Sequence, residues 1–177
     1  MKYWHKLVHF IFYYVTWLSV VISINQDYYI TGYATTTLFI CVQLLIAYYD
    51  RLIDHFFIAT VSLIMAAALT IDTIMVLQDI IIFKAPRFDH LIVPYWMWVL
   101  WFSFAINVLL IYPWLLKNHL AASISLGFGV PFGYWLGLNI NLAELNGPLW
   151  LLAIWGIYWC GASYLIGYTR DIMTSHR

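Results

Sequence analysis

Residues 56–78 read FFIATVSLIMAAALTIDTIMVLQ, a run whose only charged side chain is Asp72. A helix of about 20 apolar residues, at 1.5 Å per residue, crosses the roughly 30 Å hydrocarbon core of a bilayer. This stretch therefore predicts a transmembrane helix with one acidic group inside it.

Similar apolar runs recur along the whole chain, separated by short segments that carry most of the charges. The six predicted spans are residues 7–24, 29–49, 56–78, 91–115, 119–138 and 148–169. Lipid requires every backbone group to be paired within the protein, and no alternating ten-residue pattern of a barrel is seen, so helices are expected. The prediction is a single all-α domain over residues 1–177, a polytopic membrane helical bundle. A re-entrant fifth segment is the alternative, because that span is short and rich in glycine.

The composition excludes several other classes of protein. Of the 177 residues, 64% are hydrophobic and 9% are charged, with a mean hydropathy of +0.84, which no ordinary soluble domain shows. Eight Lys and Arg balance eight Asp and Glu, so there is no basic surplus to bind nucleic acid. Membrane lipids are the partners that this composition favours.

The basic residues predict how the chain is oriented. With six spans, both termini lie on one side of the membrane. On that side fall Lys2, Lys6, Arg51, Lys117, Arg170 and Arg177, whereas Lys84 and Arg87 fall on the other. Because basic residues accumulate in cytoplasmic segments, we expect cytoplasmic N and C termini.

Small side chains form a row along the fifth span. They recur every four residues, at Ala121, Ser125, Gly129, Gly133 and Gly137. Such a row predicts a face on which another helix packs closely, and Gly156 opens a matching row in the sixth span. Contact within the chain is favoured because the two spans are consecutive, and a homo-oligomer is the alternative. Pro131 cannot donate to the carbonyl of Gly127, so a kink is expected there.

Two polar residues lie deep in the predicted spans. An unpaired Asp72 would cost about 2.5 to 3.5 kcal/mol on the insertion scale, so it needs a partner or a cavity. Lys84 or Arg87 is expected to reach it from the following loop, and Tyr134 to lie at similar depth. Asn107 is expected to hydrogen-bond to another helix. If the protein is an enzyme, Asp72, Asn107 and Tyr134 are the candidate catalytic residues.

Histidines gather on the predicted cytoplasmic side and form the candidate metal site. Those considered are His5, His9, His55 and His119, of which the first two share a helix face. Interfacial histidines commonly bind no metal, so the prediction is that the protein holds no metal and no cofactor. Cys41 and Cys160 are expected to be small buried thiols, although a bridge between neighbouring spans is conceivable.

A family resemblance emerges from two motifs in the second half of the chain. These are WFSFAIN at residues 101–107 and GFGVPFGYWLG at residues 127–137, with Trp114 and Leu115 between them. Together with Trp17 and Asp72, they make the chain resemble the small bacterial inner-membrane proteins of domain of unknown function 2878. The resemblance implies a multi-pass protein of the bacterial inner (cytoplasmic) membrane, in a context of envelope-lipid modification.

Three functions follow as hypotheses. The favoured one is a non-enzymatic scaffold or accessory component for lipid-modifying enzymes, because no strong catalytic motif is present. The second is a membrane enzyme acting on a lipid or apolar substrate, with Asp72 as acid or base. The third is a small dimeric transporter with Asp72 as proton carrier.

Overall fold

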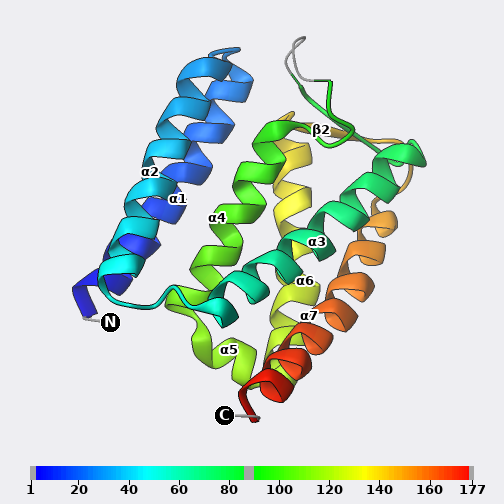
Figure 1. Cartoon of the computed structure of the whole chain (residues 1–177). Coiled ribbons are helices and arrows are strands. Elements are labelled where there is room, and N and C mark those ends of the chain that lie inside the picture. Colours follow the sequence, from blue (N-terminus) through cyan, green and yellow to red (C-terminus); the bar gives the residue numbers. More distant parts are fainter. Residues whose placement is uncertain (1–2, 86–89, 176–177) are drawn as a thin grey trace.

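The computed structural model describes residues 3–85 and 90–175, and most of them are helical (Figure 1). In chain order the helices are α1 (Tyr3–Asn25), α2 (Tyr29–Tyr49), α3 (His55–Leu77), α4 (Tyr95–Ile111), α5 (Pro113–Lys117), α6 (His119–Asn139) and α7 (Leu152–Ser175). Two short strands, β1 (Ile81–Phe83) and β2 (Ala143–Leu145), and a 3-10 helix at Leu149–Leu151 complete the order. The predicted all-α bundle is confirmed.

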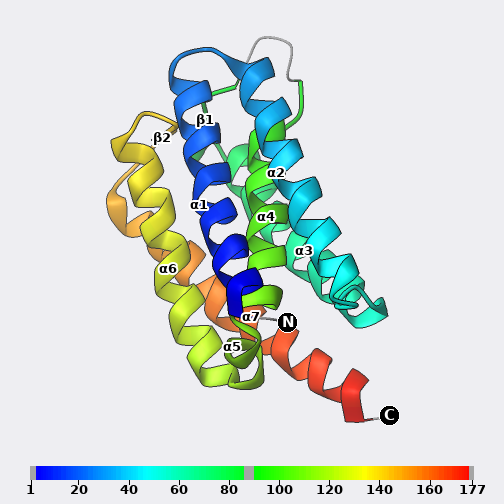
Figure 2. The same cartoon turned by 90° about the vertical axis from the view of Figure 1, so that its left-hand side faces the viewer.

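Successive long helices run in opposite directions through the bundle. The N-terminal and C-terminal ends therefore lie at the same end of the molecule, and the two strands lie at the other (Figures 1 and 2). This arrangement agrees with termini on a common side, and the cytoplasmic assignment of that side stays a prediction.

Among the residues that the structure describes, five helical segments are long and apolar enough to cross a membrane. They are Trp4–Asn25, Tyr29–Tyr49, His55–Leu77, His119–Asn139 and Leu149–Thr169. Large apolar side chains cover their outer faces, and Ile30, Phe128 and Ile157 are each at least 75% exposed. A surface of this kind suits lipid rather than water. The chain is thus consistent with a multi-pass membrane protein.

The fourth predicted span is shorter than expected. Residues 91–115 were predicted as one helix, but α4 covers only 17 residues, about 26 Å. Pro94 precedes it in an extended conformation. Pro113 starts α5, and because a proline has no N–H and restricts the residue before it, α4 ends at Ile111 and Tyr112 leaves the helix. The prediction was wrong at both ends for this reason.

Helix α4 forms the centre of the bundle. Ten of its 17 residues are buried, and it packs against α1, α2 and α3. Helix α7 packs against α3 and, most extensively, against α6. The α1–α2 pair therefore packs on α4, whereas α7 brings the α6–α7 pair against α3.

Side-chain caps explain where two of the helices begin. The Asp54 carboxylate accepts a hydrogen bond from the Phe57 amide at 2.8 Å and starts α3. The Asn118 side chain accepts from the Ala121 amide at 3.1 Å and starts α6. Each cap pairs a backbone N–H that has no partner within its helix.

The two strands pair in an antiparallel ladder, with Ile81 opposite Leu145 and Phe83 opposite Ala143. This short sheet joins the α3–α4 connection to the α6–α7 connection at the end of the bundle away from the termini (Figure 1). Loops were predicted at both places.

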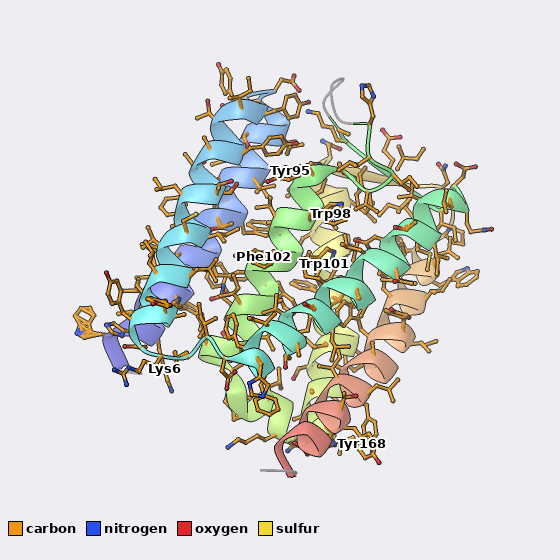
Figure 3. The ribbon with its side chains drawn as sticks, in the orientation of Figure 1. Lys6, Tyr95, Trp98, Trp101, Phe102 and Tyr168 are labelled. Carbon is orange, nitrogen blue, oxygen red and sulfur yellow. The ribbon has the colours of Figure 1, made fainter. Side chains whose placement is uncertain are left out.

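Aromatic side chains lie towards both ends of the bundle, where such amphipathic rings commonly anchor a protein at the headgroups of a bilayer. Figure 3 places Tyr95 and Trp98 towards the end that carries the strands, and Tyr168 with Lys6 towards the end that carries the termini. Trp101, in contrast, lies near the middle and is 7% exposed.

Candidate functional site

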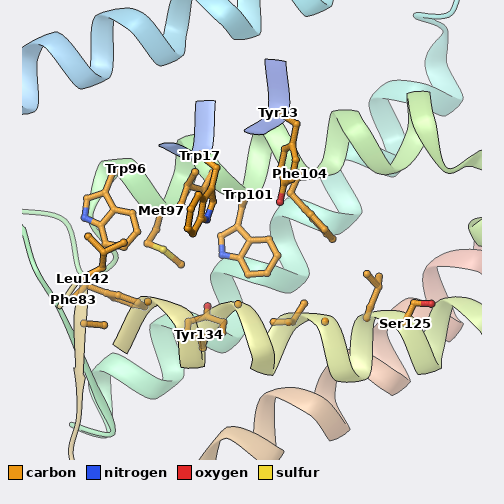
Figure 4. Close-up of a pocket in the computed structure, with 17 residues that line it drawn as sticks. Tyr13, Trp17, Phe83, Trp96, Met97, Trp101, Phe104, Ser125, Tyr134 and Leu142 are labelled. Carbon is orange, nitrogen blue, oxygen red and sulfur yellow. The ribbon is translucent and has the colours of Figure 1, made fainter. Parts of the chain in front are cut away.

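A cavity of about 320 Å³ lies between α1, α4 and α6. Figure 4 shows the side chains of α1 and α4 pointing from one side and those of α6 from the other. The aromatic lining residues are Tyr13, Trp17, Phe83, Trp96, Trp101, Phe104 and Tyr134. The end nearest the sheet is formed by Phe83 together with Leu142 and Ala143.

The row of small residues on α6 lines this cavity instead of contacting a helix. Ser125, Gly129, Gly133 and Gly137 all belong to the lining. A Cβ built on any of the three glycines would meet no atom within 4 Å in the described chain. The structure therefore differs from the predicted packing face, because the missing side chains leave space open. Ala121, at the start of the row, is half-buried and is not part of the lining.

The close contact between α6 and α7 lies on another face, at Gly127 and Gly156. A Cβ on Gly156 would lie 2.8 Å from the Gly127 carbonyl oxygen and 3.3 Å from Pro131. A Cβ on Gly127 would lie 2.2 Å from the Cys160 sulfur. Helix α6 passes through Pro131 without interruption, and the carbonyl that Pro131 cannot pair faces Gly156.

Asp72 lies directly behind the wall of the cavity. It has no exposed surface and is not part of the lining, but two lining residues bond to it. The Trp101 indole N–H donates to Oδ2 at 2.8 Å, and the Tyr134 hydroxyl donates to Oδ1. The Trp155 indole N–H donates to Oδ1 at 3.4 Å. One carboxyl group thus joins α3, α4, α6 and α7.

These partners differ from the predicted cation. The Lys84 ammonium lies 3.6 Å from the Asp27 carboxylate and 3.4 Å from the Asn25 carbonyl oxygen, away from Asp72. Arg87, the other candidate, lies outside the described residues. A buried carboxyl group needs hydrogen-bond donors, and here aromatic side chains supply them. The prediction that Tyr134 lies at the depth of Asp72 is correct.

The donors are themselves held by ring contacts. The Trp101 ring stacks on Trp159, with centroids 5.1 Å apart, and the Tyr134 ring packs against Trp155 at 4.8 Å. Trp96 is fixed by a hydrogen bond from its indole N–H to the Lys84 carbonyl at 2.8 Å. The cavity therefore has a rigid aromatic wall, which suits recognition of an apolar group.

A second cavity of about 250 Å³ continues from the first towards α5. The two share four lining residues, Tyr13, Phe104, Ser125 and Leu126. Asn107 lines the second cavity and is 3% exposed. Its amide N–H donates to the Ser103 carbonyl at 2.8 Å. This hydrogen bond lies within α4, whereas a hydrogen bond to another helix was predicted.

Three of the candidate metal histidines make contacts of their own. His5 lies 2.6 Å from Asp50, His119 lies 2.9 Å from Asp171, and the His55 ring packs on Phe56. His9 is fully buried between helices. Within residues 3–85 and 90–175, no three His, Cys, Asp or Glu side chains are grouped to hold a metal ion. The two cysteines are free, and both are exposed on the surface of the described chain rather than buried.

Comparison with protein families agrees with the resemblance seen in the sequence. The family model described as Protein of unknown function (DUF2878) matches residues 6–165, which is most of the chain. The chain belongs to this family. No curated protein and no solved structure matches it significantly. The DUF2878 match includes every residue that lines the two cavities and all four residues of the Asp72 network.

Most of the cavity wall was not predicted from the sequence. Trp96 lies near the start of the predicted fourth span, where such a ring is usual as a membrane anchor, and Trp17 was named only as a match to the DUF2878 pattern. Both are lining residues. The sequence signal that could have revealed this wall is the number of aromatic residues in the first and fourth spans, which is larger than membrane anchors at the span ends explain.

Proposed function

We propose that the protein is a lipid-binding membrane protein whose cavity holds an apolar chain. The observation that carries this proposal is the aromatic cavity between α1, α4 and α6, with a row of glycines in place of side chains on one wall. Its volume of about 320 Å³ is that of a small-molecule site.

The glycine wall of the cavity is not covered by other side chains. Ser125, Gly129 and Gly133 line the cavity and are exposed in the described chain. We propose that this surface is reached from the hydrocarbon of a bilayer, so that a lipid chain enters sideways without crossing water. Burial of each CH₂ against the aromatic wall contributes about 0.8 kcal/mol relative to water, and less relative to lipid.

The cellular role that we propose is that of an accessory component in envelope-lipid modification, in the bacterial inner membrane. The resemblance to the family implies that context. The arrangement of Asp72 supports a binding role, because the carboxyl group is enclosed by three donors and has no surface on the cavity. Lipid-modifying enzymes are the proposed partners.

An enzyme acting on an apolar substrate is the second candidate. The observation that favours it is the Tyr134 hydroxyl, which belongs to a cavity-lining residue and is hydrogen-bonded to Asp72. Such a pair is able to exchange a proton with a bound substrate. A transporter with Asp72 as proton carrier needs a water path, and the complete burial of Asp72 does not support one.

Filling the cavity tests the proposed function. The probe is hexadecane carrying a diazirine, added to vesicles that contain the protein, with labelled residues mapped by mass spectrometry. We expect labels on the segments 13–17 and 96–104 in the unmodified protein. Gly133→Leu places a side chain in the cavity and should remove most of that labelling.

The matched control is Gly161→Leu, since Gly161 is also an exposed helical glycine with open space around it but lies outside both cavities. It should leave the labelling pattern unchanged. Labelling that is equal in Gly133→Leu and in Gly161→Leu would refute the proposed function.

A further inference from the structure

Two polar side chains on the α1 wall of the cavity between α1, α4 and α6 have no partner in the described chain. Tyr13 and Trp17 are four residues apart, so they share one face of α1, and both line the cavity. Neither the Tyr13 hydroxyl nor the Trp17 indole N–H makes a hydrogen bond to any atom of residues 3–85 and 90–175. Figure 4 shows both rings pointing from α1 towards α6.

The other two tryptophans of the lining have partners for their indole groups. The Trp96 N–H donates to the Lys84 carbonyl at 2.8 Å, and the Trp101 N–H donates to Asp72 at 2.8 Å. An indole N–H that is removed from water usually has a hydrogen-bond partner, because its lost hydration is otherwise not replaced. The unpaired Trp17 N–H therefore marks the position at which a polar group of a ligand is expected.

Both unpaired groups can be reached from the cavity. Tyr13 and Trp17 are half-buried, and the Tyr13 oxygen and the Trp17 nitrogen are not fully enclosed by the described residues. The ring nitrogens of His9 and the carbonyl oxygen of Asn107 are also unpaired in the described chain, but they are enclosed. A ligand in the cavity therefore meets Tyr13 and Trp17, and it meets neither His9 nor the Asn107 oxygen.

The chemistry of these two groups restricts the ligand. An indole N–H only donates, so the ligand must carry an acceptor. A carbonyl oxygen has two lone pairs, which suit one hydrogen bond from Trp17 and one from Tyr13. An alcohol brings a donor of its own, which the Trp17 N–H cannot accept. A plain hydrocarbon fits the cavity but leaves both groups unpaired.

Charge excludes an anionic acceptor. Every residue that lines this cavity in the described chain is uncharged. Asp72, which is bonded to Trp101 and Tyr134 of the lining, is an acid and offers an anion no attraction. A carboxylate or a phosphate in the cavity would lose its hydration without gaining a counter-ion. The acceptor must therefore be neutral.

From these observations we infer that the cavity binds a neutral lipid with a carbonyl group, to which Trp17 and Tyr13 donate hydrogen bonds. This inference rests on the proposed function, since it names the class of lipid that the same cavity takes. Ester lipids such as diacylglycerol and quinones with an apolar tail both present the required carbonyl. Fatty-acid anions do not belong to this class.

Photoreactive probes that differ only in their polar group test the inference. They are hexadecane, hexadecan-2-one and hexadecan-2-ol, each carrying the same diazirine and added at equal mole fraction to vesicles that contain the protein. In the unmodified protein the ketone should label the segments 13–17 and 96–104 more than the alkane, by about 2- to 10-fold for each hydrogen bond gained. The ketone should also label these segments more than the alcohol.

Trp17→Phe keeps an aromatic ring but removes the N–H, so it should lower the ratio of ketone to alkane labelling by about 2- to 10-fold. Tyr13→Phe removes only the hydroxyl and should lower the same ratio, which gives a second variant if the first does not fold. Trp4→Phe is the control, because Trp4 lies on the same helix but is exposed and outside both cavities. It should leave the ratio unchanged. Comparing this ratio between variants removes any difference in the depth at which the probes lie.

Competition distinguishes the two sources of the carbonyl. Unlabelled dioctanoylglycerol and a decyl-substituted benzoquinone are each added in excess over the ketone probe. The compound that removes the ketone labelling identifies the source, and either result supports the inference. Failure of both compounds to compete would overturn it.

Three other results would overturn the inference while leaving the proposed function intact. The first is equal labelling by ketone and alkane in the unmodified protein. The second is a ratio that is unchanged in both Trp17→Phe and Tyr13→Phe, and the third is stronger labelling by the alcohol than by the ketone. Labelling that is equal in Gly133→Leu and Gly161→Leu with every probe would instead refute the site itself.

Discussion

Replacing Asp72 by Asn tests whether one carboxyl group holds four helices together. Both oxygens of Asp72 accept hydrogen bonds, from Trp101 on one side and from Tyr134 and Trp155 on the other. Asn has the same shape, but it offers one oxygen and an NH₂ group that only donates.

The cost follows from counting donors. If the amide oxygen faces Tyr134 and Trp155, the NH₂ group faces the Trp101 N–H, and two donors oppose each other. If the amide is reversed, the Tyr134 hydroxyl turns to accept from the NH₂ group, but the Trp155 N–H loses its acceptor, because an indole cannot accept. Either way one buried indole N–H is unpaired, which costs about 1 to 3 kcal/mol. For a chain of this length that lowers Tm by about 2 to 12 °C.

The assay is thermal unfolding of the purified protein in mild detergent. Asp79→Asn is the control, because Asp79 is an exposed residue in the turn after α3 and its positive φ of 55° suits Asn equally well. Asp79→Asn should leave Tm unchanged. A Tm of Asp72→Asn equal to or above that of the unmodified protein would show that the carboxyl group does not stabilise the helix contacts, and the reasoning would fail.

Three further outcomes are expected. Gly127→Ala should destabilise the protein by about 1 to 3 kcal/mol, because the added Cβ overlaps the Cys160 sulfur. Adding Cys160→Ala should restore the stability, and if unfolding measurements show no coupling between the two changes, the α6–α7 contact is contradicted. Asp54→Ala should cost about 0.5 to 2 kcal/mol by removing the cap of α3, and unchanged unfolding would argue against that cap. The hydrogen bond from the Tyr29 hydroxyl holds the pKa of Asp27 below its ordinary value. The stabilisation of the fold by this hydrogen bond is therefore present above about pH 4 and is lost as the pH falls through the lowered pKa. Tyr29→Phe should raise the pKa of Asp27 in an NMR titration, and an unmoved pKa would exclude the hydrogen bond.

The long apolar helices were predictable because long apolar runs leave few alternatives. The second predicted span, 29–49, coincides with α2, and the third, 56–78, lies within one residue of α3. The fourth was overextended because hydropathy does not register Pro113, which ends α4 through a missing donor. The strands were not predicted, because three residues pair only when tertiary contacts bring both segments together.

Several residues of the candidate site were predictable, but the contacts between them were much less so. Asp72 and Tyr134 were expected at a common depth, and they are bonded. The face of Gly133 was not predictable, since a small residue suits both a close helix contact and an open cavity. A cation was expected to pair with Asp72, but the indole N–H groups of two tryptophans bind it instead. Because indoles are uncharged, a search of the sequence for charged partners does not find them.

The short sheet sets a requirement on the order of assembly during synthesis. Ile81 and its partner Leu145 are 64 positions apart, and β2 emerges only after α6. A nascent chain that ends before α6 holds Asp72 with only Trp101 as a donor, because Tyr134 and Trp155 follow later. Until the last helical hairpin forms, the chain contains an incompletely paired acid and an unfinished cavity. A chain that stops before α6 therefore keeps Asp72 short of two of its three donors, at the cost that an unpaired acid carries in an apolar environment.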